Sequence, residues 1–316
     1  MKKNSLYSKA ILAQLLHFLY TLTSRIFRSN ISILSTLKTI IFLAAFFFLF
    51  SCAKKDTLDE VPARIMTNIS YGSDTRQKFD IYLPAQRNST DTKILILIHG
   101  GGWTEGDKVD FNPFIIEMQK RLPDYAIANI NYRLVSNNQN LFPAQENDVN
   151  AAIEFIAGKS AEYNISRKIS LLGASAGGHL SLLQAYKHTA SIPVKAVISL
   201  FGPTELVSLY NNSSNSSIPL ILKTVTGGTP STNLLIYQQS SPYNYVTSTS
   251  CPTLLLHGGN DPLVPASQSV ILKNELQAKG VVHEYVFYPS EGHGWTGLNL
   301  ADTFNRIEAF LKQHVK

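Results

Sequence analysis

The sequence predicts an α/β domain in which helices cover both faces of a mostly parallel sheet. Two observations indicate this fold class. Short apolar segments alternate with longer amphipathic ones along most of the chain, and residues 94–98 are all isoleucine or leucine. An unbroken apolar strand is typical of a parallel sheet that is buried on both faces. With 316 residues, the chain is long enough for one large domain with a sizeable core.

The predicted elements alternate along the chain. Strands are expected at residues 65–71, 78–83, 94–99, 125–132, 168–174, 194–201, 253–257 and 283–288. Helices are expected at 113–121, 143–157, 176–186, 265–279 and 302–315. Pro143 and Gly158 mark the start and stop of the second helix, in keeping with the usual asymmetry of helix ends.

Residues 202–246 break this alternation. The segment is rich in serine, asparagine and threonine and has one apolar patch, at 218–225. We interpret it as a small lid inserted above the carboxyl edge of the sheet. A disordered surface loop is the alternative.

The first 51 residues differ from the rest in charge. They contain six basic residues and no acidic one: Lys2, Lys3, Lys9, Arg25, Arg28 and Lys38. Because these six equal the formal net charge of +6, the remaining chain is close to neutral, and its charge does not predict a nucleic-acid partner. The apolar run at 39–50 is short for a membrane span and has the length of a signal-peptide core.

Residues 49–52, Leu-Phe-Ser-Cys, resemble a bacterial lipobox, which implies cleavage before Cys52 and lipid attachment to that cysteine. We therefore expect a lipoprotein signal peptide at 1–51, a tether at 52–63 and the α/β domain at 64–316. The expected location is the bacterial cell envelope, on a membrane. An uncleaved N-terminal anchor is the alternative, and it predicts the same location.

Two glycine-containing motifs follow buried strands. In Gly-Ala-Ser-Ala-Gly at 173–177, Ser175 stands at the apex of a sharp strand-to-helix turn, where side chains in place of the flanking glycines would collide with the strand and the helix. Three glycines at 100–102 follow the most apolar strand, and their backbone N–H groups can turn toward a ligand, as an oxyanion hole requires. Taken alone, the first motif could also be a turn with a structural serine, and the second could also be a flexible loop.

A serine nucleophile needs a histidine base and a carboxylate that orients it. His293 lies in the predicted loop between the last strand and the last helix, and Asp261 lies in the loop after the strand at 253–257. We predict these two residues as the partners of Ser175. His257 is the strongest alternative base, and His179 is expected to pack against the sheet.

Two other acidic residues compete with Asp261. Glu291 is so near His293 in sequence that it does not easily approach the far side of the ring. Asp148 precedes Ser175 on a predicted helix, and we expect it to form a structural ion pair with Arg133.

Five motifs in this order resemble those of α/β-hydrolase carboxylesterases: HGGGW at 99–103, NYRL at 131–134, GASAGG at 173–178, HGGNDPLVP at 257–265 and EGHGW at 291–295. The resemblance runs from about residue 65 to the C-terminus. It is closest to bacterial esterases and lipases of the hormone-sensitive-lipase-like and acetylxylan or feruloyl esterase-like branches. Ala174 departs from the hormone-sensitive-lipase-like pattern, which has aspartate there. The chain also lacks the N-terminal helical cap of that branch, which implies a more open site.

The resemblance implies an α/β-hydrolase fold, a triad of Ser175, Asp261 and His293, and oxyanion donors from the N–H groups of Gly101, Gly102 and Ala176. It implies no metal and no organic cofactor. The expected function is a serine carboxylesterase that hydrolyses short-chain or carbohydrate-linked esters through an acyl-enzyme. An arylformamidase, a serine peptidase and a non-catalytic surface protein with a hydrolase fold are the alternatives.

Overall fold

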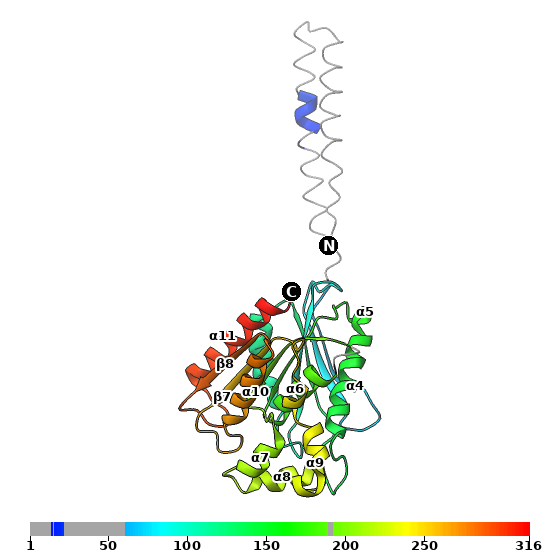
Figure 1. Cartoon of the computed structure of the whole chain (residues 1–316). Coiled ribbons are helices and arrows are strands. Elements are labelled where there is room, and N and C mark those ends of the chain that lie inside the picture. The colour runs from blue at the N-terminus through cyan, green and yellow to red at the C-terminus, as the bar shows by residue number, and fades with distance from the viewer. Residues whose placement is uncertain (1–13, 15, 22–60, 189–191) are drawn as a thin grey trace. The chain divides into compact units, whose positions relative to one another are not determined.

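The computed structural model describes residues 14, 16–21, 61–188 and 192–316, and the rest of the chain is drawn in grey in Figure 1. The chain divides into two units, Met1–Asp59 and Glu60–Lys316. Cys52 and nearly all of the expected signal peptide and tether lie outside the described residues. Within the described ranges, no helix has both the length and the apolar character needed to cross a membrane.

An eight-stranded sheet forms the centre of the second unit, in the order β1-β2-β4-β3-β5-β6-β7-β8. β1 and β2 pair antiparallel, as do β2 and β4, and every other pair of neighbours is parallel. The strands are β1 (Arg64–Ser70), β2 (Lys78–Leu83), β3 (Lys93–Ile98), β4 (Tyr125–Ile130), β5 (Ile169–Ala174), β6 (Val194–Leu200), β7 (Thr253–Gly258) and β8 (His283–Tyr288). The predicted mostly parallel sheet is confirmed.

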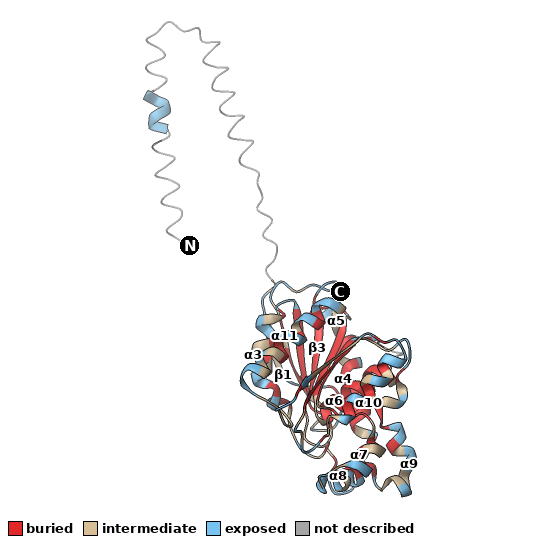
Figure 2. Cartoon of the chain, turned by 60° about the vertical axis from the view of Figure 1, so that its left-hand side comes forward, coloured by how far each residue is buried: buried red, intermediate tan, exposed pale blue. Residues whose placement is uncertain are grey.

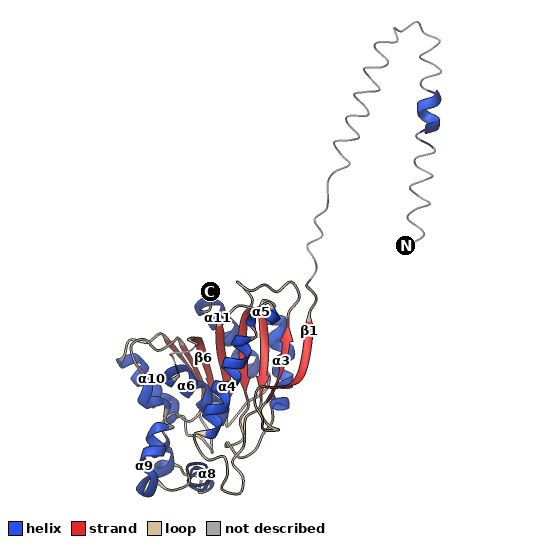
Figure 3. Cartoon of the chain, turned by 90° about the vertical axis from the view of Figure 1, so that its right-hand side faces the viewer, coloured by secondary structure: helices blue, strands red, loops and turns tan. Residues whose placement is uncertain are grey.

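Helices cover both faces of this sheet. They are α3 (Asn112–Arg121), α4 (Ala144–Gly158), α5 (Ser160–Tyr163), α6 (Ala176–Lys187), α7 (Leu206–Asn212), α8 (Ser217–Thr226), α9 (Pro230–Gln239), α10 (Ser267–Ala278) and α11 (Gly297–His314), with 3-10 turns η1 (Lys108–Phe111) and η2 (Pro242–Tyr245). Figure 2 shows α3 and α11 on one side of the buried strands and α4, α6 and α10 on the other. Figure 3 shows the same layers from a second direction.

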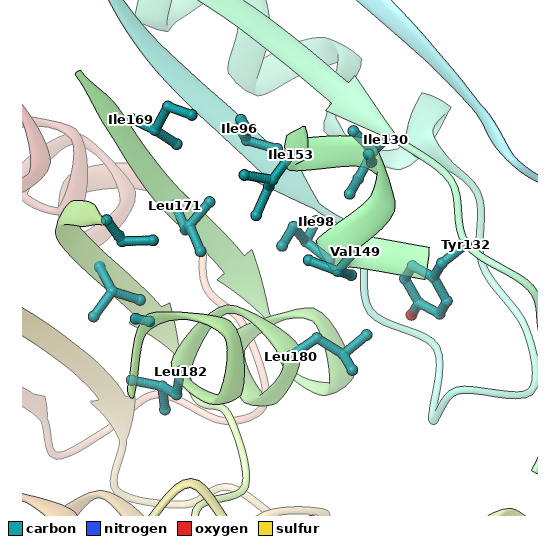
Figure 4. Packing of buried hydrophobic residues seen from close by; sticks show 14 of the residues in the cluster. Ile96, Ile98, Ile130, Tyr132, Val149, Ile153, Ile169, Leu171, Leu180 and Leu182 are labelled. Atoms are coloured by element: carbon teal, nitrogen blue, oxygen red, sulfur yellow. The ribbon is translucent and has the colours of Figure 1, made fainter. Parts of the chain in front are cut away.

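The unbroken apolar run of β3 serves both layers. Ile96 and Ile98 belong to the core beneath α4 and α6, whereas Leu95 and Leu97 belong to the core beneath α3 and α11. All four side chains are fully buried. Figure 4 shows the first of these cores, where isoleucines of the strands pack against Ile153 of α4. A strand with side chains in two cores has no polar face, which is why its sequence does not alternate.

The insertion at 202–246 is helical. It contains α7, α8, α9 and η2, and Figure 1 shows the three helices together at the end of the domain opposite the C-terminus. Because the segment is polar, its apolar residues do not recur at helical spacing over enough positions to predict α7 or α9. The last helix begins at Gly297 instead of residue 302, and Leu298 in its first turn is 89% exposed. An apolar stripe therefore does not mark this start.

The base of the lid is attached to α6, the helix that follows Ser175. His179 Nε2 donates to the carbonyl of Ser240 at 2.5 Å, and Lys187 Nζ donates to that of Gln239 at 3.0 Å. Lys187 also lies 2.8 Å from the buried carboxylate of Glu146. Burial of Glu146 acts to raise its pKa, but hydrogen bonds from His188 and Lys187 outweigh burial and hold the pKa below the usual 4.5.

Replacing Glu146 with glutamine should reduce the free energy of unfolding more at pH 7 than in acid. Because the folded pKa is lowered, the ionised carboxylate stabilises the fold above about pH 4.5, and this contribution is lost as the pH falls through the folded pKa. Urea denaturation at pH 7 and at about pH 4 measures the difference. Exposed Glu154, changed to glutamine, is the control and should alter stability little at either pH. A Glu146 effect of equal size at both pH values would contradict this account.

Candidate active site

Ser175 occupies a strained position between β5 and α6. Its backbone has φ 54° and ψ −122°, and its N–H donates to the carbonyl of Leu200 at 2.8 Å. A positive φ is uncommon for a residue with a side chain and is typical of functional turns. A Cβ on Gly177 would lie 1.9 Å from the carbonyl oxygen of Ile98, and one on Gly173 would lie 2.1 Å from that of Gly177. The turn therefore requires glycine on both sides of Ser175.

Gly177→Ala should destabilise the fold by about 3 kcal/mol or more, since overpacking a close backbone contact typically costs about 1–3 kcal/mol and this one involves a carbonyl that cannot rotate away. The matched control is Gly158→Ala at the end of α4, where an added Cβ meets nothing within 4 Å. That change should be neutral or slightly stabilising. Urea denaturation of both variants measures the contrast, and equal stabilities would refute the packing argument.

Ser175, His293 and Asp261 form one line of hydrogen bonds. His293 Nε2 lies 2.9 Å from Ser175 Oγ, and His293 Nδ1 lies 2.7 Å from Asp261 Oδ2. An ionised carboxylate only accepts hydrogen bonds, so Nδ1–H donates to Asp261 and Nε2 is left to accept the hydroxyl proton of Ser175. The three residues follow β5, β8 and β7, whose carboxyl ends lie at one edge of the sheet.

The carboxylate of Asp261 is held from several directions. Its side chain has no exposed surface, and Oδ1 accepts the N–H groups of Leu263 and Val264 at 2.8 and 2.9 Å. Burial acts to raise the pKa of Asp261, but hydrogen bonds from His257, His293 and the Val264 N–H outweigh it and hold the pKa far below its usual range. The carboxylate is therefore ionised at neutral pH, as an orienting partner of a histidine must be.

The alternative base, His257, has a different environment. It is fully buried, its Nε2 lies 2.8 Å from the carbonyl oxygen of Val264 and 3.4 Å from Asp261, and its Nδ1 lies 2.7 Å from Ser269 Oγ. Both ring nitrogens of His257 thus interact with residues of the segment 261–269. His257 contributes to the placement of the Asp261 loop.

The alternative acids are also engaged elsewhere. Glu291 accepts a hydrogen bond from Asn299. Asp148 accepts the side chain and the backbone N–H of Arg133 at 2.7 and 2.8 Å, so the expected structural ion pair is confirmed.

His179 does more than pack against the sheet. Its ring lies edge-on to Trp103 and Phe142, with centroids 5.1 and 5.5 Å away, and its Nε2 donates to Ser240 in the lid base. It therefore joins three segments around the nucleophile: the glycine loop, the start of α4 and the lid.

The glycine loop is fastened at both ends. Gly101 and Gly102 have φ values of 104° and 55°, which a residue with a side chain rarely adopts. Buried His99, whose pKa burial lowers to about 4, donates from Nδ1 to the carbonyl of Gly100 at 2.7 Å. At the other end, Arg76 donates to the carbonyl of Gly106 at 2.7 Å. Sequence reasoning missed Arg76, because it lies on a turn before β2 and belongs to no recognisable motif.

Five of the six residues predicted for the site line one pocket of about 410 Å³: Ser175, His293, Gly101, Gly102 and Ala176. Asp261 lies behind His293. The lid contributes the apolar side of the pocket through Leu209, Ile218 and Ile221. The arrangement brings a hydroxyl, a base and a glycine-loop backbone to one cavity wall, which is the geometry of acyl transfer to serine.

Comparisons with known proteins agree with this geometry. The BD-FAE family profile matches residues 79–276, more than half of the chain. Two proteins of Mycobacterium tuberculosis match 78% of the chain each: Esterase LipC is 24% identical with 64% of its length covered, and Probable carboxylic ester hydrolase LipM is 29% identical with 60% covered. The chain thus spans about three-fifths of the length of these curated relatives.

Among solved structures, a truncated carbohydrate esterase from gut microbiota is 25% identical, with a TM-score of 0.68. The match covers 82% of this chain and 99% of that one. These matches, with the sheet order and the Ser175 turn, show that the chain belongs to the BD-FAE family and has the α/β-hydrolase fold that its motifs predict.

Proposed function

We propose that this protein is a serine carboxylesterase in which Ser175 is the nucleophile, His293 the general base and acid, and Asp261 the orienting carboxylate. The observation that carries the proposal is the line of hydrogen bonds, 2.9 Å and 2.7 Å long, that ends at Ser175 Oγ in the pocket wall. The esterase names of the relatives support the same class of reaction.

In the first step, Ser175 Oγ bonds to the ester carbonyl carbon while His293 Nε2 takes the hydroxyl proton. The carbonyl oxygen becomes an oxyanion, for which we assign the N–H groups of Gly101, Gly102 and Ala176 as donors. The carbon–oxygen bond to the alcohol then breaks. The alcohol leaves with the proton from Nε2, and the acyl group stays on Ser175.

In the second step, water attacks the acyl-enzyme and gives its proton to His293 Nε2. The same donors hold the second oxyanion, and the acid leaves as Ser175 recovers its proton. Asp261 keeps Nδ1 protonated throughout, so that Nε2 faces the serine in both steps.

We assign short-chain or carbohydrate-linked esters as the substrate class. The pocket at Ser175, about 410 Å³, lies within the size range of small-molecule sites. The relative from gut microbiota is named a carbohydrate esterase, which supports this class by similarity.

A panel of chromogenic substrates tests the reaction class in the full-length protein. p-Nitrophenyl acetate and butyrate report esterase activity, an N-formyl anilide reports arylformamidase activity and a peptide p-nitroanilide reports peptidase activity. We expect kcat/KM to be highest for the esters. Preferred hydrolysis of the anilide or the peptide would replace the proposal with the corresponding activity. A folded protein inactive on all of them would favour a non-catalytic role.

We also propose that a lipid on Cys52 anchors the protein to a membrane of the bacterial cell envelope. The apolar run followed by the lipobox-like Leu-Phe-Ser-Cys supports this assignment. Cys52→Ala should move the protein from the membrane fraction to the soluble fraction, or leave it with an uncleaved leader of higher mass. Cys251→Ala is the matched control and should leave the fractionation unchanged. Equal fractionation and equal mass of Cys52→Ala and wild type would exclude lipidation.

A further inference from the structure

A second pocket adjoins the one that contains Ser175. Its volume is about 180 Å³, and it shares Gly100, Asp110, Ala174 and Phe201 with the larger pocket. We call it the side pocket, and the larger one the lid pocket. The side pocket is bounded by residues of η1, α3 and α11, the elements on the sheet face opposite α4 and α6: Phe111, Phe114, Leu300 and Thr303. The side pocket therefore lies beside the pocket that contains Ser175, toward the face of the sheet that α3 and α11 cover.

Phe201 lines both pockets. It follows β6 directly, has φ 44°, and its N–H donates to the carbonyl of Leu256 at 2.8 Å. Its ring centroid lies 4.5 Å from that of His293 and 5.4 Å from that of Trp295. A positive φ is costly for a bulky residue and is retained where the surroundings impose it. At Phe201, this backbone conformation accompanies a ring that lies beside the His293 imidazole and lines both pockets.

The side pocket is small and apolar. Its walls include the aromatic rings of Phe111, Phe114, Phe201 and Trp295. The polar Trp295 Nε1 is already engaged, because it donates to Thr303 Oγ1 at 2.7 Å. A dry cavity of about 150 Å³ lined by similar side chains holds benzene, so the side pocket has room for one six-membered ring or a short chain. The lid pocket is more than twice as large and includes Thr104 and Glu105 in its wall, so it suits a larger arm with polar groups.

Negative charge marks the junction of the pockets. Asp110 is exposed and lines both of them, and Glu105 lines the lid pocket. In the part of the chain that the structure describes, no lysine or arginine lines either pocket. A carboxylate on the substrate would therefore meet repulsion at the junction without a compensating cation.

We propose that the side pocket is the acyl subsite and the lid pocket the alcohol subsite of the esterase proposed above, on which this inference rests. Phe114 limits the acyl group to about the size of one ring, and Asp110 selects against acyl groups that carry a carboxylate. The sizes of the pockets decide the assignment, because the acyl arm is the smaller one in a short-chain ester of a carbohydrate.

Crossed substitutions test the assignment in the full-length protein. Phe114→Ala enlarges the side pocket, and Ile221→Ala enlarges the lid pocket as its matched control. Each is assayed on p-nitrophenyl acetate, benzoate and 2-naphthoate, and on acetates of phenol, naphthol and an acetylated disaccharide. We expect Phe114→Ala to raise the naphthoate-to-acetate ratio of kcat/KM by about tenfold, in keeping with pocket contacts of a few methylenes, while Ile221→Ala leaves that ratio unchanged. Ile221→Ala should shift only the alcohol series.

Asp110→Asn tests the charge selection. The ratio of kcat/KM for p-nitrophenyl butyrate over the p-nitrophenyl hemisuccinate anion should fall about fivefold, the effect of one nearby solvent-exposed charge. Exposed Asp91→Asn, away from both pockets, is the control and should keep the wild-type ratio.

The outcomes separate this inference from the esterase proposal. A wild type that hydrolyses none of the esters contradicts the proposed function. If the wild type hydrolyses the esters, the results of the two variants test the subsite assignment alone. The assignment is contradicted if Phe114→Ala shifts the alcohol series or if Ile221→Ala shifts the acyl series. It is also contradicted if neither variant changes either ratio while thermal melts show both to be folded. An unchanged butyrate-to-hemisuccinate ratio in Asp110→Asn contradicts the role of Asp110.

Discussion

Ser175→Ala is expected to reduce kcat for p-nitrophenyl butyrate by about 10⁶-fold, the loss typical of a serine hydrolase without its nucleophile. The Ser175 hydroxyl is the protein group that bonds to the acyl carbon in the proposed mechanism, so its loss removes the acyl-enzyme route. The pocket and the glycine loop are unchanged by the substitution, and KM should therefore change little. Steady-state hydrolysis at saturating substrate measures the effect.

The control for this variant is Ser214→Ala, an exposed serine of the lid, which should keep wild-type kcat. Thermal melts of both variants establish that they are folded. A rate of Ser175→Ala above about a hundredth of the wild-type rate would far exceed the residual activity typical of such variants. It would mean that another group is the nucleophile.

Asp261→Asn should reduce kcat by about 10⁴-fold. The amide keeps the size of the side chain, and its oxygen is expected to stay with the N–H groups of Leu263 and Val264. Its NH₂ group then faces His293 and does not accept the Nδ1–H, so the imidazole is favoured in the tautomer that presents a proton to Ser175 instead of a lone pair. Since the carboxylate also accepts the N–H groups of Leu263 and Val264, we expect some loss of stability as well. Activity measured well below the melting temperature separates the two effects.

Glu291→Gln is the matched control, because Glu291 is the nearby acid that the sequence left as an alternative and its carboxylate is bound to Asn299. It should retain activity within a few-fold of wild type. A larger loss of kcat in Glu291→Gln than in Asp261→Asn would reverse the roles assigned to the two acids.

Much of the sheet was predictable because buried strands have a direct signature in sequence. β3 reads as an apolar run since its side chains alternate between two cores, and the glycines around Ser175 are required by contacts of 1.9 and 2.1 Å that any Cβ would make. The positions of Asp261 and His293 in loops after β7 and β8 followed from the same alternation. Because the carboxyl ends of these parallel strands lie at one edge, both loops lie near the Ser175 turn.

Other features have no signature in local sequence. The lid helices pack polar segments against the domain through contacts such as His179 with Ser240, which lie 61 positions apart in the chain. The side pocket is formed by Phe111, Trp295 and Phe201 from three separate connections, and only the folded chain brings them together. The early start of α11 was missed because Leu298 is exposed, so no apolar stripe begins there.

The most direct test of the central claim is to trap the covalent intermediate on the proposed nucleophile. The full-length protein is incubated with a p-nitrophenyl alkylphosphonate, which forms a stable analogue of the acyl-enzyme, and is then measured by intact mass and peptide mass spectrometry. We expect one adduct per chain, on the peptide that contains Ser175, and none in Ser175→Ala. An adduct on a different residue, or ester hydrolysis that continues in a fully trapped protein, would contradict it.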